Sequence, residues 1–423
     1  MLIAGWRRGA LLPLTFPDYR RLLLGNIFWW QCFHMEVVVI GWLVFDLTSS
    51  PWMVSLVSFC RSLPLLLVGF WTGPLIDRFG RRKIIIAAQT VNFCAYLSMA
   101  LLLWSGAAAV WNIALVSFVL GTAWAIDWPA RRALLPDIVG KAQVVDSMLL
   151  DSFLVGIGRI VSPFSAGALI AWFGALGCYT VMSLLSVAAL ITLSTLTHQP
   201  IPRTSMRPTA RPWTLIGHGL RYVRHNQVIL AVLLITLIMN LWIFPYTTLL
   251  PVFAREVLQQ GPVGLGMLST GTGIGAFLGL ILINWIRRRY SNGLIFIVGS
   301  LWMCLALIAF ALSANYQFSW LMLFTAGLGM SCFGTLQSAI ILLSASDEMR
   351  SRVMGLLVLA IGSDPLGQLQ IGYLAEHFGP QSTLIGIASA AACSILLIAV
   401  FFPSLRRPEG QPLPAPAVAA ASD

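Results

Sequence analysis

The residues of this sequence with the most evident chemistry are a few ionisable side chains inside long apolar segments. The chain has 423 residues, of which 58% are hydrophobic and only 10% are charged. Charged residues make up about 25% of an ordinary soluble domain. Ionisable groups inside membrane segments are costly and mark functional sites by default. Those in this chain are His34, Glu36, Arg61, Asp127, Asp151, Arg159 and Asp364.

Glu36 is the first candidate for a proton carrier. It lies about 11 residues, or roughly 16 Å of helix, from the end of its apolar segment, near the middle of a bilayer. Desolvation disfavours the charged form of a lone carboxylate, which suits proton loading and release. The alternative is a permanent pair with Arg61, which lies at similar depth. His34 is two residues from Glu36 and about 200° around the helix, so the two cannot face one cavity. For His34, a satisfied buried histidine is the alternative to a proton relay.

A faint internal repeat connects Arg159 with Asp364. The segment GRIVSPFSAGALIAWFG (158–174) aligns with SDPLGQLQIGYLAEHFG (363–379), and the offset of 205 residues places Arg159 opposite Asp364. Arg159 could anchor an anionic substrate or form a pair with Asp364. Such a pair would break as the two halves of the chain, each with one copy of the repeat, move. Asp364 could instead neutralise Arg61, or carry the proton.

Aromatic and amide side chains in these segments favour a cavity for bulky, partly apolar solutes. With Arg61 and Arg159, the predicted lining consists of Asn26, Trp30, Gln31, Trp124, Asn240, Trp242, Tyr246 and Gln337. Asp127 and Asp151 are expected near the membrane interface, where they organise the Arg131–Arg132 loop.

The elements that carry these residues are membrane-spanning helices. The apolar blocks are about 20 residues long, enough to cross a bilayer as a helix. Lipid cannot satisfy backbone polar groups, and continuous apolar blocks favour helices over a barrel. We predict an all-α integral membrane protein of about twelve spans near 22–47, 52–76, 84–104, 110–130, 148–171, 176–196, 228–253, 265–286, 293–312, 319–345, 352–374 and 380–402.

The net charge of +11 reflects topology rather than a nucleic-acid partner. All 26 Lys and Arg residues except Arg61, Arg159 and Arg255 fall on one side of the predicted spans. The positive-inside rule then places both termini in the cytoplasm, with the chain in the inner membrane. The seven cysteines form no CxxC pair, so we expect neither a disulfide nor a metal site, and no cofactor is predicted.

The chain divides into two halves of six spans. A polar segment, residues 198–227, separates residues 1–197 from residues 228–402 and is predicted to be a cytoplasmic loop. The low-complexity tail, residues 403–423, is predicted to be disordered. Two parallel six-helix halves are typical of a large class of secondary transporters.

The stretch GPLIDRFGRRK (73–83) resembles the signature between helices 2 and 3 of the major facilitator superfamily. The resemblance implies that the loop stabilises contact between the halves when the cytoplasmic side is closed. Asp77 would meet the helix beginning near Arg352, and Asp347 or Glu348 could pair with Arg81 or Arg82. The switch residues are Gly73, Asp77, Arg78, Gly80, Arg81 and Arg82.

Two further stretches, DWPARRALLPDIV (127–139) and LLPVFAREVLQQGPVGLGMLSTGTGIGAFLG (249–279), resemble the branch with the enterobactin exporter and macrolide or multidrug efflux proteins. The resemblance implies a monomeric, proton-driven exporter of a siderophore-like or amphipathic drug-like molecule. Ser162-Pro163 departs from the Gly-Pro step usual in helix 5 of proton-driven antiporters. The alternatives are a lysophospholipid transporter, a small-metabolite importer or, with less support from motifs, a membrane enzyme.

Overall fold

The structure, a computed structural model, describes residues 11–197 and 220–406, and these residues form helices and connections without a strand. Eleven of the described helical segments are long and apolar enough to cross a membrane. One of them, α7 (Val144–Ser194), has 51 residues and would extend about 76 Å as a straight helix, too long for one span. Gly174 interrupts it with φ +67°, so α7 supplies two spans and the total is twelve.

The N-terminal helices follow the predicted spans, except that the second span is broken at Gly69–Trp71, and two of these helices begin at a proline. Proline suits the first turn of a helix because the N–H that it lacks would have no intrahelical partner there. Pro17 opens the first long helix and Pro51 the second. The elements are η1 (Leu12–Thr15), α2 (Pro17–Thr48), α3 (Pro51–Val68), η2 (Gly69–Trp71), α4 (Thr72–Phe79), α5 (Arg81–Trp104), α6 (Val110–Val139), η3 (Lys141–Gln143) and α7.

The C-terminal helices include two broken spans. The seventh span contains π-helical turns and Pro245, and the eleventh is interrupted at Gly362 and Ser363. The elements are α9 (Gln227–Ile238), η4 (Met239–Ile243), α10 (Tyr246–Val252), η5 (Phe253–Val257), α11 (Pro262–Ile286), α12 (Asn292–Leu312), α13 (Tyr316–Ser344), α14 (Asp347–Ile361), α15 (Asp364–Phe378), α16 (Pro380–Phe401) and η6 (Pro403–Arg406).

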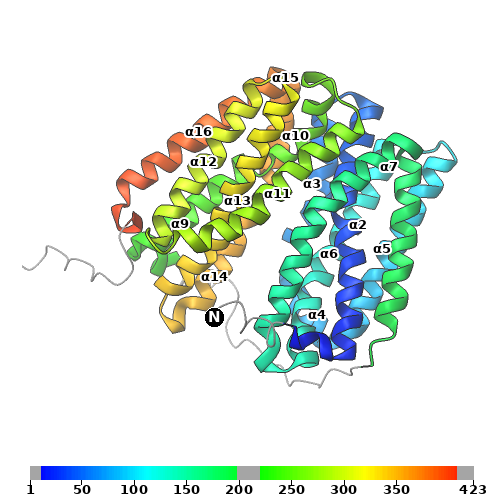
Figure 1. Ribbon diagram of the computed structural model, residues 1–423, viewed down its shortest axis with the longest axis horizontal. Helices are drawn as coiled ribbons and strands as arrows, with labels where there is room; N and C mark the ends of the chain where they lie inside the picture. The colour runs from blue at the N-terminus through cyan, green and yellow to red at the C-terminus, as the bar shows by residue number, and fades with distance from the viewer. Residues whose placement is uncertain (1–10, 198–219, 407–423) are drawn as a thin grey trace, which may run out of the picture.

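The helices form two bundles that meet at one end and diverge at the other (Figure 1). We call the end that holds η1 and η6 the termini end, and the end where α3 begins and α15 finishes the opposite end. The bundles pack on each other through α7 against α11 and α3 against α15. The domain boundaries stay a prediction, because residues 198–219 and 407–423 lie outside the described residues.

Glycines allow the closest approach between the bundles. A Cβ on Gly266 of α11 would lie 2.4 Å from the carbonyl oxygen of Pro163 on α7, and one on Gly167 would lie 2.5 Å from that of Pro262. A side chain at either position would force the backbones apart. The seam between α7 and α11 therefore depends on small residues, as is common where membrane helices pack closely.

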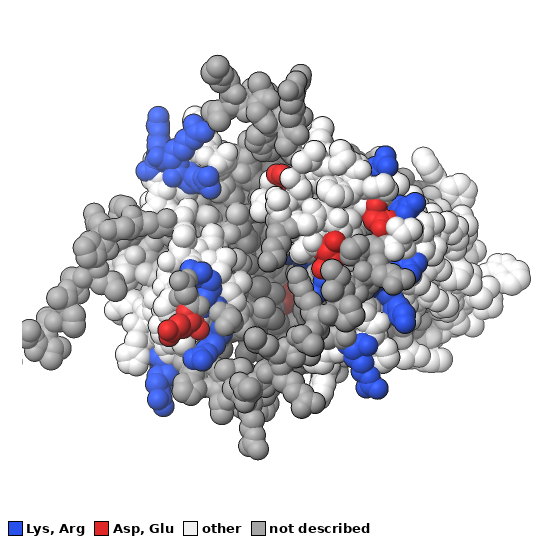
Figure 2. All heavy atoms as spheres, turned by 90° about the horizontal axis from the view of Figure 1, so that it is seen from below, with Lys and Arg blue, Asp and Glu red and all other residues white. Residues whose placement is uncertain are grey.

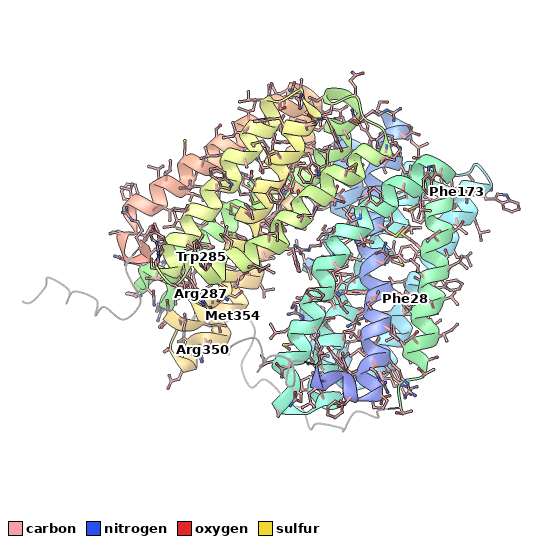
Figure 3. All side chains as sticks on the ribbon, viewed as in Figure 1. Phe28, Phe173, Trp285, Arg287, Arg350 and Met354 are labelled. Atoms are coloured by element: carbon pink, nitrogen blue, oxygen red, sulfur yellow. The ribbon has the colours of Figure 1, made fainter. Side chains whose placement is uncertain are left out.

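Basic side chains gather at the termini end. Figure 2 shows this face, with Lys and Arg on both bundles and fewer Asp and Glu. In Figure 3, Arg287 and Arg350 lie toward this end of the C-terminal bundle, whereas Phe173 lies at the opposite end of the N-terminal bundle. This distribution agrees with the one-sided placement of basic residues that the sequence predicts.

Candidate functional site

A cavity of about 720 Å³ lies between the two bundles. Its lining comes from both halves, with α2, α3, α6 and α7 on one side and η4, α11, α13 and α15 among the elements on the other. The lining extends toward the termini end as far as Arg132 and Ser152. A second pocket of about 220 Å³ shares His34 and Arg159 with it and adds Tyr246, Ser269 and Thr272. We call this second pocket the deep pocket.

An aromatic wall covers the N-terminal side of the cavity. Phe33 and Trp124 are stacked with ring centroids 5.7 Å apart, and Trp124 and Trp128 are stacked at 5.9 Å. A guanidinium lies on each end of this row: Arg61 is 4.6 Å from the Phe33 centroid and Arg132 is 4.5 Å from the Trp128 ring. Such a wall offers flat surfaces and positive charge to an aromatic solute.

Glu36 does not line the cavity but contacts Arg61, which does. Its side chain is 1% exposed, and its Oε2 accepts a hydrogen bond from Arg61 Nε at 2.5 Å. Arg61 lines the cavity, but Glu36 does not. Its other oxygen, Oε1, is buried without a hydrogen-bond partner among the described residues. In this conformation the structure therefore shows the paired arrangement of Glu36 and Arg61 that was the alternative to a free proton carrier.

A second buried charge network lies within the N-terminal bundle. Arg131 donates to Asp127 at 2.9 Å, to Asn26 at 2.7 Å and to Gln89 at 3.2 Å. Asn26 in turn donates to Asp151 at 2.9 Å. The two aspartates thus organise Arg131 directly or through Asn26. The sequence predicts that Asn26 lines the cavity. Asn26 is instead buried in this network and lies outside the cavity lining.

Arg159 has a different environment from Arg61 and Arg131. It lines both the cavity and the deep pocket. None of the ion pairs in the described part of the chain includes it. His34 lies in the same two linings, stacked on Trp30 with centroids 5.6 Å apart, and its Nε2 is buried without a described partner. His34 therefore faces the cavity, whereas Glu36 faces away from it.

Asp364 is the only carboxylate among the described residues that line the cavity. It begins α15 and accepts a hydrogen bond from Gln368 Nε2 at 2.6 Å. The same Nε2 donates to Ser62 Oγ in the other bundle at 3.1 Å. Neither predicted ion pair of Asp364 is present here, because it forms none with Arg159 and Arg61 is paired with Glu36.

The other predicted lining residues fall into two groups. Trp30, Trp124, Asn240 and Gln337 line the cavity, and Tyr246 lines the deep pocket. Gln31 instead hydrogen-bonds Ser165 at 2.7 Å and Ser162 at 2.8 Å. Trp242 lies outside both linings.

Sequence reasoning missed Phe33, Trp128 and Arg132, which also line the cavity. Trp124, Trp128 and Arg132 are spaced by four residues on α6, a spacing that puts side chains on one helix face. That spacing was the available signal. Phe33 had no comparable signal, since α2 carries aromatic residues at several neighbouring positions.

The described contacts of the switch motif lie within its own bundle. Arg81 forms an ion pair with Asp137 and donates to the Ala133 carbonyl oxygen at 2.7 Å, and both partners lie on α6. Arg82 donates to the Ser194 carbonyl oxygen at 2.8 Å. Gly80 ends α4 with φ 84°, and Arg78 lies 5.4 Å from the Phe79 centroid.

The side chains of Asp77 and Asp347 and the surroundings of Gly73 lie outside the described part of the molecule. The contact of Asp77 with the helix near Arg352 therefore stays a prediction. The pairing of Arg81 or Arg82 with Asp347 or Glu348 also stays a prediction, for a conformation in which the termini end is closed.

At the opposite end, polar contacts join the bundles. Glu376 Oε2 on α15 accepts from Ser50 Oγ at 2.8 Å and from the Trp52 backbone N–H at 3.1 Å, where α3 begins. Arg255 pairs with Asp46 at 2.5 Å. These contacts, together with the α7–α11 seam, close the molecule beyond the cavity.

The fold and the cavity are those of a membrane transporter with two helical halves. The model of the transmembrane secretion effector family matches residues 8–419, so the chain belongs to this family of major facilitator transporters.

Among relatives, the staphyloferrin A transporter of Staphylococcus aureus is 22% identical over 83% of this chain and 88% of its own length. The multidrug efflux pump Tap of Mycobacterium tuberculosis is 26% identical, covering 88% and 90% respectively. Macrolide efflux protein A of Streptococcus pyogenes is 23% identical, covering 82% and 86%. The chain thus spans most of the length of each of these transport and efflux proteins.

Solved structures confirm the fold. The nucleoside transporter NupG superposes with a TM-score of 0.71 at 15% identity, covering 91% of this chain and 99% of NupG. A bacterial homologue of the lysosomal transporter Spinster, in an inward-facing and unoccupied conformation, gives a TM-score of 0.72 at 14% identity, covering 93% and 99%. At these identities the likeness shows the fold alone, which is the predicted all-α fold of the major facilitator superfamily.

Proposed function

We propose that this chain exports a siderophore-like or amphipathic drug-like molecule by alternating access, driven by inward proton movement. The observation that carries the proposal is the cavity itself, which has an aromatic and cationic wall, lies between the two bundles, and is closed off at the opposite end. The basic termini end is taken as cytoplasmic. A molecule would then enter from the cytoplasm and leave after the bundles close there and open at the opposite end.

The relatives support efflux over the other candidates. Their names include a staphyloferrin A transporter, a multidrug efflux pump and a macrolide efflux protein, and all of these are transport or efflux proteins. A membrane enzyme would need acids, histidines or serines gathered for catalysis at one site. Among the lining residues described here, the acid–base groups are His34 and Asp364, each in a different bundle. Transport therefore remains the proposal, with inner-membrane location and both termini in the cytoplasm.

For the proton carrier, the contacts favour Asp364 over Glu36. A proton on Glu36 would break a buried ion pair and leave Arg61 uncompensated, a change that costs about 3–5 kcal/mol in measured proteins. Asp364 lines the cavity and has an amide as its described partner, so protonation leaves no opposite charge unpaired. Protonation would also change how Gln368 is shared between Asp364 and Ser62 of the other bundle. Asp364 therefore links a proton to a contact between the halves.

Proton flux in proteoliposomes with an internal pH dye tests this function. The panel contains siderophores, macrolides and lysophospholipids, and the variants are Asp364→Asn, Glu36→Gln and, as control, Asp146→Asn in the first turn of α7. We expect substrate-evoked proton flux in the wild type and in Asp146→Asn, and its loss in Asp364→Asn with retained substrate binding. Glu36→Gln should lose stability as well as transport.

Substrate movement without protons in the wild type would refute the coupling. Unchanged coupling in Asp364→Asn would mean that a group other than Asp364 carries the proton. A protonophore control separates coupled flux from leak, and liposomes without protein give the background.

A further inference from the structure

Within the proposed function, on which this inference rests, we infer that the cavity is selective for organic anions. The head group, a carboxylate or a catecholate, binds Arg159 beside His34 at the entrance to the deep pocket. The aromatic body of the same molecule lies along the wall formed by Phe33, Trp124 and Trp128. The substrate is therefore an amphipathic anion rather than a cationic or neutral drug.

The first observation is that no ion pair among the described residues offsets the positive charge of Arg159. The three other arginines at or near the cavity have other partners: Arg61 has Glu36, Arg131 has Asp127, and Arg132 lies on Trp128 at the exposed mouth. Arg159 lines two connected pockets and belongs to none of the described ion pairs. Arg159 is half-buried, and a partly desolvated guanidinium with no carboxylate partner among the described residues favours an anion from elsewhere, because desolvation makes an unpaired charge costly.

The second observation is that the backbone of Arg159 lies at the seam between the bundles. A Cβ on Gly273 of α11 would lie 2.5 Å from the Arg159 carbonyl oxygen and 3.4 Å from the Arg159 Cβ. The backbone that carries Arg159 thus packs directly on the other half. An anion held by Arg159 lies where the two bundles meet, so binding there can influence how they move relative to each other.

The third observation is the set of polar groups that line the deep pocket with Arg159 and are able to donate hydrogen bonds. His34 Nε2 is buried without a described partner, and Tyr246 shares only a 3.4 Å contact with Thr272. Ser269 and Thr272 add hydroxyl groups to the deep pocket, and no carboxylate contributes to its described lining. Donors without an acid favour an anionic head group, since guanidinium and ring N–H groups bind carboxylate oxygens through charge-assisted hydrogen bonds.

The position of the aromatic wall indicates where the body of the ligand would lie. From Phe33, the row of rings runs through Trp124 and Trp128 to Arg132, which lies toward the termini end. A ligand with its head at Arg159 therefore has its body directed toward the cavity mouth. One anionic head group and one or two aromatic rings match this length and chemistry, and the cavity volume of about 720 Å³ accommodates such a molecule.

The experiment uses two probes with one fluorescent body and different charge. Dansylglycine carries a carboxylate, and dansylglycinamide is its neutral analogue. Both accept energy from excited tryptophans, and Trp30, Trp124 and Trp128 line the cavity. Binding to the purified full chain is measured for the wild type, Arg159→Gln, Arg159→Lys and Arg289→Gln. The last variant removes an exposed arginine that lines neither pocket and serves as the matched control.

We expect the wild type to bind dansylglycine at least about tenfold more tightly than the amide, the scale of a hydrogen bond to a charged group. Arg159→Gln should abolish this preference and still bind the amide, which shows that the cavity is intact. Arg159→Lys should retain part of the preference, and Arg289→Gln all of it.

Equal binding of the two probes by the wild type, or an unchanged preference in Arg159→Gln, would overturn the inference. Failure of the wild type to bind either probe would overturn it as well. Transport of the same probes separates this inference from the proposed function. Arginine-dependent anion binding without transport would refute the function and retain the anion site. Transport of both probes without a charge preference would support the function and refute the anion site.

Discussion

The two bundles are in contact at one end of the molecule, and at the other end the described contacts of the switch motif do not join them. At the opposite end, Glu376 joins α15 to the start of α3, and glycines bring α7 and α11 into backbone contact. At the termini end, Arg81 and Arg82 of the switch motif contact α6 and α7 of their own bundle. One end is closed by contacts between bundles, and at the other the described motif contacts stay within one bundle.

This difference shows how one chain can change access to its cavity. The opposite end is held by close packing and a few hydrogen bonds, so a modest change in free energy can open it. The switch motif has basic groups that would be available to the C-terminal bundle if the termini end closed. The predicted contacts of Asp77, Arg81 and Arg82 with that bundle belong to such a state. The comparison can be tested by weakening the closed end in steps.

The largest effect is expected at the α7–α11 seam. In Gly266→Ala the new Cβ would lie 2.4 Å from the Pro163 carbonyl oxygen, so the backbones must separate. Overpacking of this kind costs about 1–3 kcal/mol. The matched control is Gly355→Ala on α14, where a Cβ would meet nothing within 4 Å. We expect a clear fall in the unfolding temperature in detergent for Gly266→Ala and little change for Gly355→Ala. Equal stability of the two variants would mean that the seam is not closely packed.

A smaller effect is expected from Glu376→Ala. The substitution removes both hydrogen bonds to the start of α3, at Ser50 and Trp52. Hydrogen bonds to charged groups contribute about 1.5–3 kcal/mol when buried, and less here because this site is exposed. We therefore expect the population open at the opposite end to rise about five- to tenfold.

Electron–electron spin distances between labels at Ser105 and Ala314, in loops of different bundles, measure this population. The exposed cysteines Cys94 and Cys393 would be replaced by serine in the background used for labelling. An unchanged distance distribution in Glu376→Ala would show that this contact does not hold the opposite end closed.

Much of the fold, but less of the site, could be predicted from sequence. The twelve spans were predictable because membrane helices need about 20 apolar residues. The join at Gly174 and the breaks near Gly69, Pro245 and Gly362 were not predicted. The positions of ionisable residues within spans were also predictable. Which way each one faces was not.

The facing of each polar side chain was not predictable because these helices are apolar on all sides. In a soluble protein the polar face of a helix identifies its buried face. In a membrane, lipid-facing and core-facing positions are equally apolar, so Asn26 and Gln31 gave no sign that they face neighbouring helices. His34 and Glu36 were separable because 200° of rotation divides them, but the sequence did not tell which one faces the cavity.

The smallest effect is expected from Arg255→Gln. Arg255 and Asp46 also join the bundles at the opposite end, but their side chains are 42% and 52% exposed. Exposed ion pairs contribute about 0–1 kcal/mol, because water and salt screen them. The same spin-label pair should therefore show less than about a fivefold change in Arg255→Gln, and added salt should reduce it further. A shift as large as that of Glu376→Ala would mean that ionic attraction, rather than hydrogen bonding at the start of α3 and glycine packing, holds this end closed. The contrast between the two ends would then be mainly one of charge.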